Sequence, residues 1–197
     1  MAFQFFRPDI AFNDIYLITP ETLISMGIKG VVFDIDNTIA PYEVPSPTDK
    51  MKNYFNALLA AGIKMAFVSN NKGDRVGLFN EGLGFFYVCK AGKPSPKGIC
   101  RCIEYFGLPK EQVLAVGDQI FTDCIAAHRA KIRFALVKPI KDKETLFFRI
   151  KRFFEKPFVK GLKWLTKKDK KVRFRRKKKR DGRFKILKIR KRTENKK

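Results

Sequence analysis

Two aspartates, Asp34 and Asp36, stand two residues apart directly after the apolar stretch 30–33. An apolar stretch of this length indicates a buried strand, and open α/β sheets bind ligands at the C-terminal ends of their strands. Two carboxylates at one strand end repel each other, and a bound Mg²⁺ ion would remove that cost. One carboxylate can then attack phosphorus while the other transfers a proton. Taken alone, the pair is equally compatible with a helix cap or with surface aspartates.

Three further groups of polar residues follow along the chain, each at the end of an apolar stretch or in a loop beyond one. They are Ser69 with Asn70, then Lys93, then Asp118 with Asp123. A hydroxyl can bind a phosphate oxygen, a lysine can neutralise charge, and carboxylates can hold a metal ion. Since the C-terminal ends of parallel strands share one sheet edge, we expect these residues and the first aspartate pair to form one site.

This order of motifs resembles that of the phosphatase branch of the haloacid dehalogenase (HAD) superfamily. The resemblance covers roughly residues 8–137 and rests on four motifs, which are Asp34-Ile-Asp-Asn-Thr, Ser69, Lys93, and Gly-Asp118 with Asp123. The Asn after the second Asp and the spacing Gly-Asp-Gln-Ile-Phe-Thr-Asp are similar to those of the YqeG-type phosphatases of subclass IIIA. The phosphatidylglycerophosphate phosphatase of fungal mitochondria belongs to the same group.

The resemblance implies a catalytic role for three of these residues. Asp34 would be the nucleophile that forms an aspartyl-phosphate, and Asp36 would be the general acid for the leaving group and then the base for the attacking water. Lys93 would stabilise charge on the nucleophile and on the phosphoryl oxygens. Lys97 lies in the same loop and competes for this role, but Lys93 precedes a proline, as in the pattern of the family. A surface position is therefore expected for Lys97.

The resemblance also implies binding roles. Ser69, together with Asn70, would bind the transferring phosphoryl group. The expected cofactor is Mg²⁺, and its site involves four aspartates: Asp34 through its carboxylate, Asp36 through its backbone carbonyl, Asp118 through its carboxylate, and Asp123 indirectly, behind a direct ligand or through water.

Five apolar stretches alternate with helical patterns, which predicts an α/β fold. With the resemblance, the expected fold is a HAD-like, Rossmannoid, doubly wound parallel sheet of about five strands, at 30–33, 64–68, 85–88, 113–116 and 134–137. Helices are expected at 50–61, 74–81, 97–106 and 123–130. The intervals between the motifs have no room for a cap domain. A capless, open site suits a phosphate carried on a large molecule better than a small metabolite.

Charge divides the chain near residue 138. Residues 1–137 hold 15 basic and 13 acidic residues, whereas residues 138–197 hold 28 basic and 6 acidic residues, out of a net charge of +24 for the chain. We therefore expect a phosphatase domain at 1–137, a basic amphipathic helical segment at 138–166, and a highly basic, flexible tail at 167–197. Blocks of like charge are typical of interaction tails.

The partner of the basic extension is left open by the sequence. The apolar face of the helical segment can dock on the domain, lie on a membrane surface, or bind another partner. Basic residues within 146–192 would attract an anionic membrane surface, and RNA or a ribosome would attract them as well. No apolar stretch approaches the ~18 residues of a membrane-spanning helix, so a cytoplasmic protein is expected, peripheral on the inner face of the membrane in the first case. The oligomeric state is not predictable from the sequence.

The resemblance implies a phosphomonoester substrate, and for part of the family this is phosphatidylglycerophosphate. The leading hypothesis is therefore hydrolysis of a lipid phosphate presented at a membrane. The alternative is a protein or nucleic-acid phosphate, with the basic tail binding RNA or the ribosome. A third hypothesis, a binding protein built on an inactive scaffold, is disfavoured because Asp34, Asp36, Lys93 and Asp118 are all present.

Overall fold

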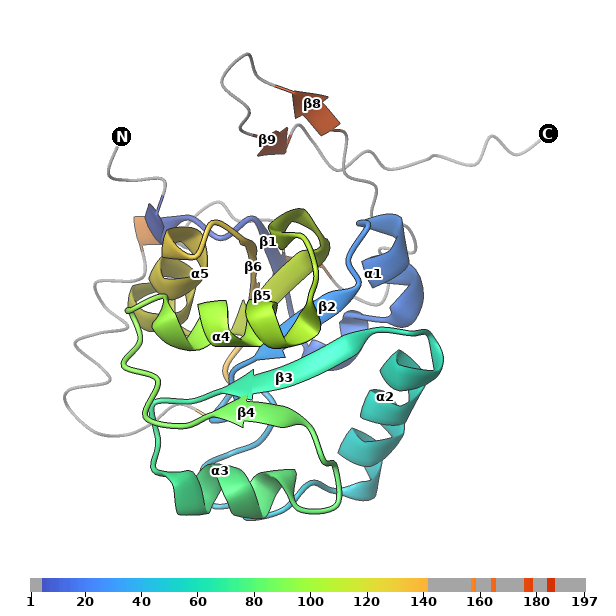
Figure 1. Cartoon of the computed structure of the whole chain (residues 1–197), viewed down its shortest axis with the longest axis vertical. Helices are drawn as coiled ribbons and strands as arrows, with labels where there is room; N and C mark the ends of the chain where they lie inside the picture. Colours follow the sequence, from blue (N-terminus) through green and yellow to red (C-terminus); the bar gives the residue numbers. More distant parts are fainter. Residues whose placement is uncertain (1–4, 142–156, 159–163, 166–175, 179–183, 187–197) are drawn as a thin grey trace.

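A parallel β-sheet forms the centre of the computed structural model, which describes residues 5–141, 157–158, 164–165, 176–178 and 184–186 (Figure 1). The strand order is β4-β3-β2-β5-β6-β1-β7. In chain order, the strands are β1 (Ile10–Phe12), β2 (Gly30–Phe33), β3 (Lys64–Val68), β4 (Phe86–Val88), β5 (Val113–Gly117), β6 (Arg133–Val137) and β7 (Trp164–Leu165). All neighbouring strands in this sheet run parallel, as the alternation of strands and helices predicts.

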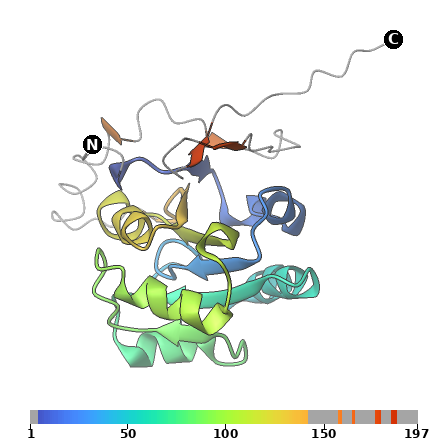
Figure 2. The same cartoon turned by 45° about the horizontal axis from the view of Figure 1, so that its top comes forward.

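Helices cover both faces of the sheet. They are α1 (Pro20–Ser25), α2 (Asp49–Ala60), α3 (Gly73–Asn80), α4 (Lys97–Phe106) and α5 (Ile125–Arg129). The first three contribute to one apolar cluster and the last two to another, and Figure 2 shows the two groups from a second direction. Along β2, Val31 and Phe33 join the first cluster while Val32 joins the second. This alternation is expected of a strand that is buried on both faces.

The register of the sheet brings the ends of three strands together. Phe33, the last residue of β2, pairs with Phe67 of β3 and with Val116 of β5. The residues that follow these strands therefore emerge side by side at one edge. The segments that connect these strands are short. Between β2 and β4 the described chain contains only α2, β3 and α3. No cap domain is inserted there, as predicted.

The sheet extends beyond the five or so predicted strands, first by β1, which pairs with β6. The three residues of β1 follow Arg7, Pro8 and Asp9, and so short a stretch shows no periodicity. The stretch is nevertheless a strand because it pairs with β6, with Ile10 opposite Ala135, and the sequence does not indicate this pairing. Asp9 extends the attachment, since its carboxylate accepts a hydrogen bond from the Phe134 backbone at 2.8 Å.

The described part of the C-terminal extension contacts the domain. Trp164 and Leu165 form β7 beside β1, where the sequence had predicted the end of a helical segment; the hydrogen bonds of an open sheet edge favour a strand there. The centre of the Phe158 ring lies 5.1 Å from the centre of the Phe6 ring and 6.1 Å from that of the Phe121 ring. Docking on the domain, one of the three alternatives, therefore holds for these residues.

Two further strands, β8 (Arg176–Lys178) and β9 (Phe184–Ile186), form an antiparallel pair within the basic tail. The remaining residues of the predicted segments 138–166 and 167–197 lie outside the described chain, so the predicted domain boundaries stay predictions. Among the helices that the structure describes, none is both long enough and apolar enough to cross a membrane.

The Phe158 contact predicts that the extension stabilises the domain. Replacing Phe158 by Ala should lower the free energy of unfolding by about 1–3 kcal/mol, because a packed aromatic ring is lost. Chemical denaturation of the full chain would measure this. The control is Leu78→Ala, which removes a side chain from an exposed position on α3. Equal, negligible losses in the two variants would show that the extension does not support the fold.

Candidate active site

The residues predicted to form the site converge at the sheet edge where β2, β3 and β5 end. They are Asp34 after β2, Ser69 after β3, Lys93 in the β4–α4 loop, Asp118 after β5, and Asp123 in the π-helical turn Ile120–Cys124. All five are buried. Buried charged groups require partners, so the contacts among these side chains decide what the site can bind.

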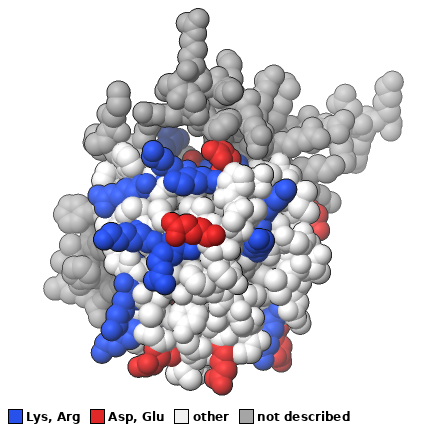
Figure 3. Space-filling view, viewed as in Figure 1, with Lys and Arg blue, Asp and Glu red and all other residues white. Residues whose placement is uncertain are grey.

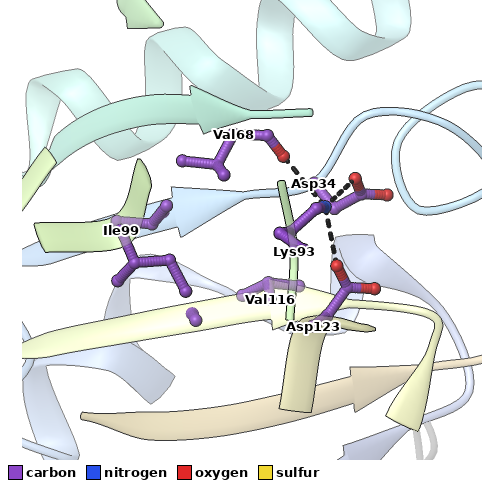
Figure 4. Close-up of a pocket in the computed structure, with 8 residues that line it drawn as sticks. Asp34, Val68, Lys93, Ile99, Val116 and Asp123 are labelled. Atoms are coloured by element: carbon purple, nitrogen blue, oxygen red, sulfur yellow. Dashed lines mark hydrogen bonds and ion pairs between the residues drawn. The ribbon is translucent and has the colours of Figure 1, made fainter. Parts of the chain in front are cut away.

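The Lys93 ammonium lies between two carboxylates (Figure 4). Its Nζ atom is 2.5 Å from Asp34 Oδ1 and 2.6 Å from Asp123 Oδ1, and it donates a further hydrogen bond to the Val68 carbonyl at 3.0 Å. The protonated lysine thus contacts three oxygen atoms, two through hydrogen bonds and Asp123 Oδ1 through an ion pair. The surrounding wall is apolar and includes Val32, Val68, Ile99, Ala115 and Val116, which strengthens the electrostatic contacts.

The side chain of Asn70 fixes the backbone of Lys93. Its amide nitrogen donates to the Lys93 carbonyl at 3.0 Å, and its oxygen accepts from the Lys93 backbone N–H at 2.8 Å. The peptide bond between Lys93 and Pro94 is cis. Asn70, expected to bind phosphate, therefore uses its side-chain amide to hold the loop that carries the lysine.

Asp34, Asp118 and Asp123 form a cluster in which one carboxylate oxygen of each residue lies within 4.8 Å of those of the other two. Gly117 permits this approach, because a Cβ atom there would come within 2.7 Å of the Asp123 side chain. Asp123 Oδ2 accepts from the Gln119 backbone N–H at 3.1 Å. Three buried carboxylates facing one ammonium leave an excess of negative charge, so the cluster fits a divalent cation bound through oxygen ligands.

The same charge imbalance affects protonation. Burial raises the pKa of Asp34 to about 8; Lys93 opposes the rise, and the nearby Asp123 and Asp118 carboxylates add to it. Burial lowers the pKa of Lys93, but Asp123 and Asp34 outweigh it and the net shift is upward. Lys93 thus stays protonated, and the repulsion among the carboxylates favours the protonated form of Asp34. A cation among them would restore the ionised form of Asp34.

The Asp36 carboxylate contacts donors that are not part of this cluster. Its Oδ2 atom lies 2.5 Å from the Asn71 amide nitrogen and 3.4 Å from the Ser69 hydroxyl. Its Oδ1 atom lies 3.5 Å from the guanidinium of Arg75, a residue of α3. The metal role that the resemblance implies for Asp36 belongs to its backbone carbonyl, and these side-chain contacts do not compete with it. The next residue, Asn37, adopts a left-handed conformation with φ of 63°, which asparagine tolerates well.

The two candidate lysines occupy different positions. Lys93 reaches Asp34, whereas Lys97 begins α4 with an exposed side chain, so only Lys93 lies where the charge-stabilising role requires.

Three site residues were missed by the sequence reasoning. They are Asn71 and Arg75, which contact Asp36, and Thr38, whose hydroxyl lies 3.0 Å from Asp34 Oδ2 and 3.4 Å from Asp118 Oδ1. Thr38 stands within the first motif and Asn71 directly after Ser69 and Asn70, so their proximity to the motifs could have identified them as site residues. No sequence feature identifies Arg75, since an arginine on a short helix is most often solvated.

Comparisons with known proteins agree with this geometry. A family model described as haloacid dehalogenase-like hydrolase matches residues 42–131. The probable phosphatase YqeG of Bacillus subtilis is 35% identical over 163 residues, which cover 83% of this chain and 95% of that protein. The chain belongs to the haloacid dehalogenase superfamily of hydrolases, and within it to the YqeG-type phosphatases.

More distant relatives extend the comparison. A phosphatidylglycerophosphate phosphatase of Arabidopsis thaliana is 29% identical over 175 residues, covering 83% of this chain but only 49% of that longer protein. Among solved structures, a putative HAD subfamily III A hydrolase from Legionella pneumophila aligns with a TM-score of 0.39 and 21% identity, over 50% of this chain and 60% of that one.

The aspartate cluster predicts opposite effects of pH and of Mg²⁺ on stability. Because the folded-state pKa of Asp34 is raised above its unfolded value of 3.8, its contribution is fully present below about pH 4 and is lost as pH rises through about 8. In EDTA, urea denaturation should therefore show lower stability at pH 8 than at pH 5. Mg²⁺ at a hundredfold excess over its dissociation constant should add about 3 kcal/mol, with the larger gain at pH 8.

The control for this experiment is Asp118→Asn, which removes one carboxylate of the cluster. It should weaken both the loss at high pH and the gain with Mg²⁺. Other titrating groups, such as His128, act with and without Mg²⁺, so the difference between the two series isolates the cluster. A Mg²⁺ gain that is absent, or the same at both pH values, would contradict the cation site.

Proposed function

We propose that this phosphatase is a Mg²⁺-dependent phosphomonoester hydrolase that works through an aspartyl-phosphate on Asp34. The observation that carries the proposal is the placement of Asp34, whose carboxylate contacts the Lys93 ammonium on one side and lies within the aspartate cluster on the other. Lys93 holds the nucleophile in place and offers positive charge to the phosphoryl oxygens. Bound Mg²⁺ would supply further positive charge at the same oxygens.

The reaction then proceeds in two steps, with the proton handled by Asp36. In the first, an Asp34 oxygen forms a bond to phosphorus, the bond to the leaving oxygen breaks, and Asp36 gives that oxygen its proton. In the second, Asp36 takes a proton from a water molecule that attacks the phosphorus of the aspartyl-phosphate, which releases inorganic phosphate and restores Asp34. Ser69 binds a phosphoryl oxygen, and its hydroxyl lies 3.4 Å from Asp36.

The substrate that fits best is phosphatidylglycerophosphate presented at a membrane surface. Two relatives, from Arabidopsis thaliana and Chlamydomonas reinhardtii, carry the name phosphatidylglycerophosphate phosphatase. The site has no cap in the described chain, so a headgroup on a lipid surface can reach it. The support for this substrate is the agreement between the names of these relatives and the open site.

Surface charge supports a membrane location. In Figure 3, basic side chains gather on the left of the face shown, the side toward which β3 and β4 point in Figure 1. The exposed basic residues of the loop before α4, of α4 itself and of α5 are Lys90, Lys97, Arg101 and Arg129. Together with the basic residues within 146–192, they would attract anionic lipid headgroups, at about 1 kcal/mol per basic residue near the surface. A peripheral position on the inner face of the membrane follows.

The alternative is a phosphate on a protein or nucleic acid, and the charge of the tail is the observation that favours it. Residues 138–197 hold 28 basic residues, and RNA would bind them with a strong dependence on salt. The two hypotheses share the catalytic site and differ only in the substrate, so one assay separates them.

The proposal predicts phosphate release from phosphatidylglycerophosphate in anionic vesicles with Mg²⁺. Asp34→Asn should lower the rate at least about 1,000-fold, because it removes the nucleophile. The matched control, Asp74→Asn, makes the same change at an exposed position on α3 and should leave the rate unchanged. Hydrolysis of a generic aryl phosphate with no release from the lipid would reject the lipid substrate and favour the alternative. Full activity of Asp34→Asn would reject the mechanism.

A further inference from the structure

Arg75 covers the proton-transferring side of the site. Asp36 Oδ2 is occupied by Ser69 and Asn71, whereas Oδ1 is buried, has no hydrogen bond within the described chain, and forms an ion pair with the Arg75 guanidinium at 3.5 Å. The side chains of Asp36 and Arg75 are only 12% and 13% exposed. The group nearest to the free oxygen of Asp36 is therefore a largely buried cation.

The guanidinium is held loosely enough to change partners. It lies 3.4 Å from the carbonyls of Pro41 and Pro45, near the limit of a hydrogen bond, and its Nε atom has no hydrogen-bond partner among the residues that the structure describes. Its central carbon lies 5.8 Å from the centre of the Tyr42 ring, and this ring is 51% exposed. Arg75 thus sits between the acid and the open loop at 41–47, with unused donor capacity.

The proton transfer of the proposed function requires this arrangement to open. The leaving oxygen must come within hydrogen-bond reach of Asp36, and Oδ1 is accessible only once the guanidinium moves aside. An arginine displaced from a carboxylate in a largely buried position loses its ionic partner, which is costly. A leaving group that carries its own anion would replace the lost partner, and a neutral leaving group would not.

We propose that Arg75 is a specificity residue that binds a second anionic group, such as a phosphodiester, on the leaving group of the substrate. The inference rests on the proposed function and adds what that function does not contain: the enzyme selects leaving groups by charge, and one residue does so. A planar guanidinium can form two parallel hydrogen bonds to a phosphodiester, and Arg75 has donors available for both.

A purely structural role for Arg75 makes a different prediction. If the residue only holds the loop at 41–47, or only orients Asp36, its removal will slow every substrate by the same factor. The ratio of kcat/KM between two esters that differ in the charge of the leaving group separates these roles. This ratio is measured within one protein preparation, so partial unfolding of a variant does not change it.

The experiment uses the full chain with Mg²⁺ and two soluble esters. One is glycerol 3-phosphate, whose leaving group is neutral; the other is glycerophosphoglycerol phosphate, the deacylated headgroup, whose leaving group carries a phosphodiester. The wild type should prefer the second by about 10- to 100-fold in kcat/KM, the size expected of hydrogen bonds to a charged group. Arg75→Gln should reduce this preference at least about tenfold, and Arg75→Lys, which keeps the charge, should reduce it less.

The matched control is Lys72→Gln, which removes the same charge from an exposed position next to α3 and should keep the preference. Equal slowing of both esters in Arg75→Gln, or a wild type with no preference, would overturn the role of Arg75 and leave the hydrolase standing. An equal loss of preference in Lys72→Gln would also overturn it. The preference would then depend on the overall positive charge near the site and not on Arg75. Failure of the wild type to hydrolyse either ester, while it still hydrolyses a generic aryl phosphate, would overturn this inference and leave the hydrolase standing. Failure on all three compounds would overturn both.

Discussion

The buried contact of the Lys93 ammonium with Asp34 and Asp123 is the interaction on which the rest of the site depends. Burying these charges is costly unless each meets a partner, and several separate parts of the chain satisfy this condition. The register of β2, β3 and β5 places Asp34, and Asn70 fixes the Lys93 backbone. The missing side chain of Gly117 admits Asp123. The single lysine leaves negative charge uncompensated, and that excess is what makes a divalent cation fit.

The site divides into two regions of opposite character. On one side, three carboxylates and a lysine suit a metal ion and a phosphoryl group. On the other, Asp36 is surrounded by neutral donors and by Arg75. Nucleophile and proton carrier are only two residues apart in sequence, yet their carboxylates face different groups. A short strand end followed by the turn at Asn37 produces this separation, which lets one motif supply two different chemical functions.

Much of this arrangement could be predicted from the sequence, since strand ends of a parallel sheet must meet. Asp34, Ser69, Lys93, Asp118 and Asp123 were expected at one edge on that ground, and the family resemblance supplied the roles proposed for them. Side-chain direction in loops was not predictable: Asn70 and Asn71 are adjacent, but one holds the Lys93 loop and the other contacts Asp36. Arg75 and the strand β1 were missed because their roles depend on contacts with distant segments, which leave no periodic pattern.

The central claim, a covalent phosphoryl group on Asp34, can be measured directly. Turnover with substrate and Mg²⁺ is quenched and treated with borohydride, which reduces an acyl phosphate of aspartate to homoserine, and the modified peptide is located by mass spectrometry. With an aryl phosphate, whose leaving group needs little protonation, Asp36→Asn would slow mainly the second step and raise the amount trapped. The account predicts homoserine at position 34, dependent on substrate. Modification at another residue, or none at 34 while phosphate is being released, would contradict it.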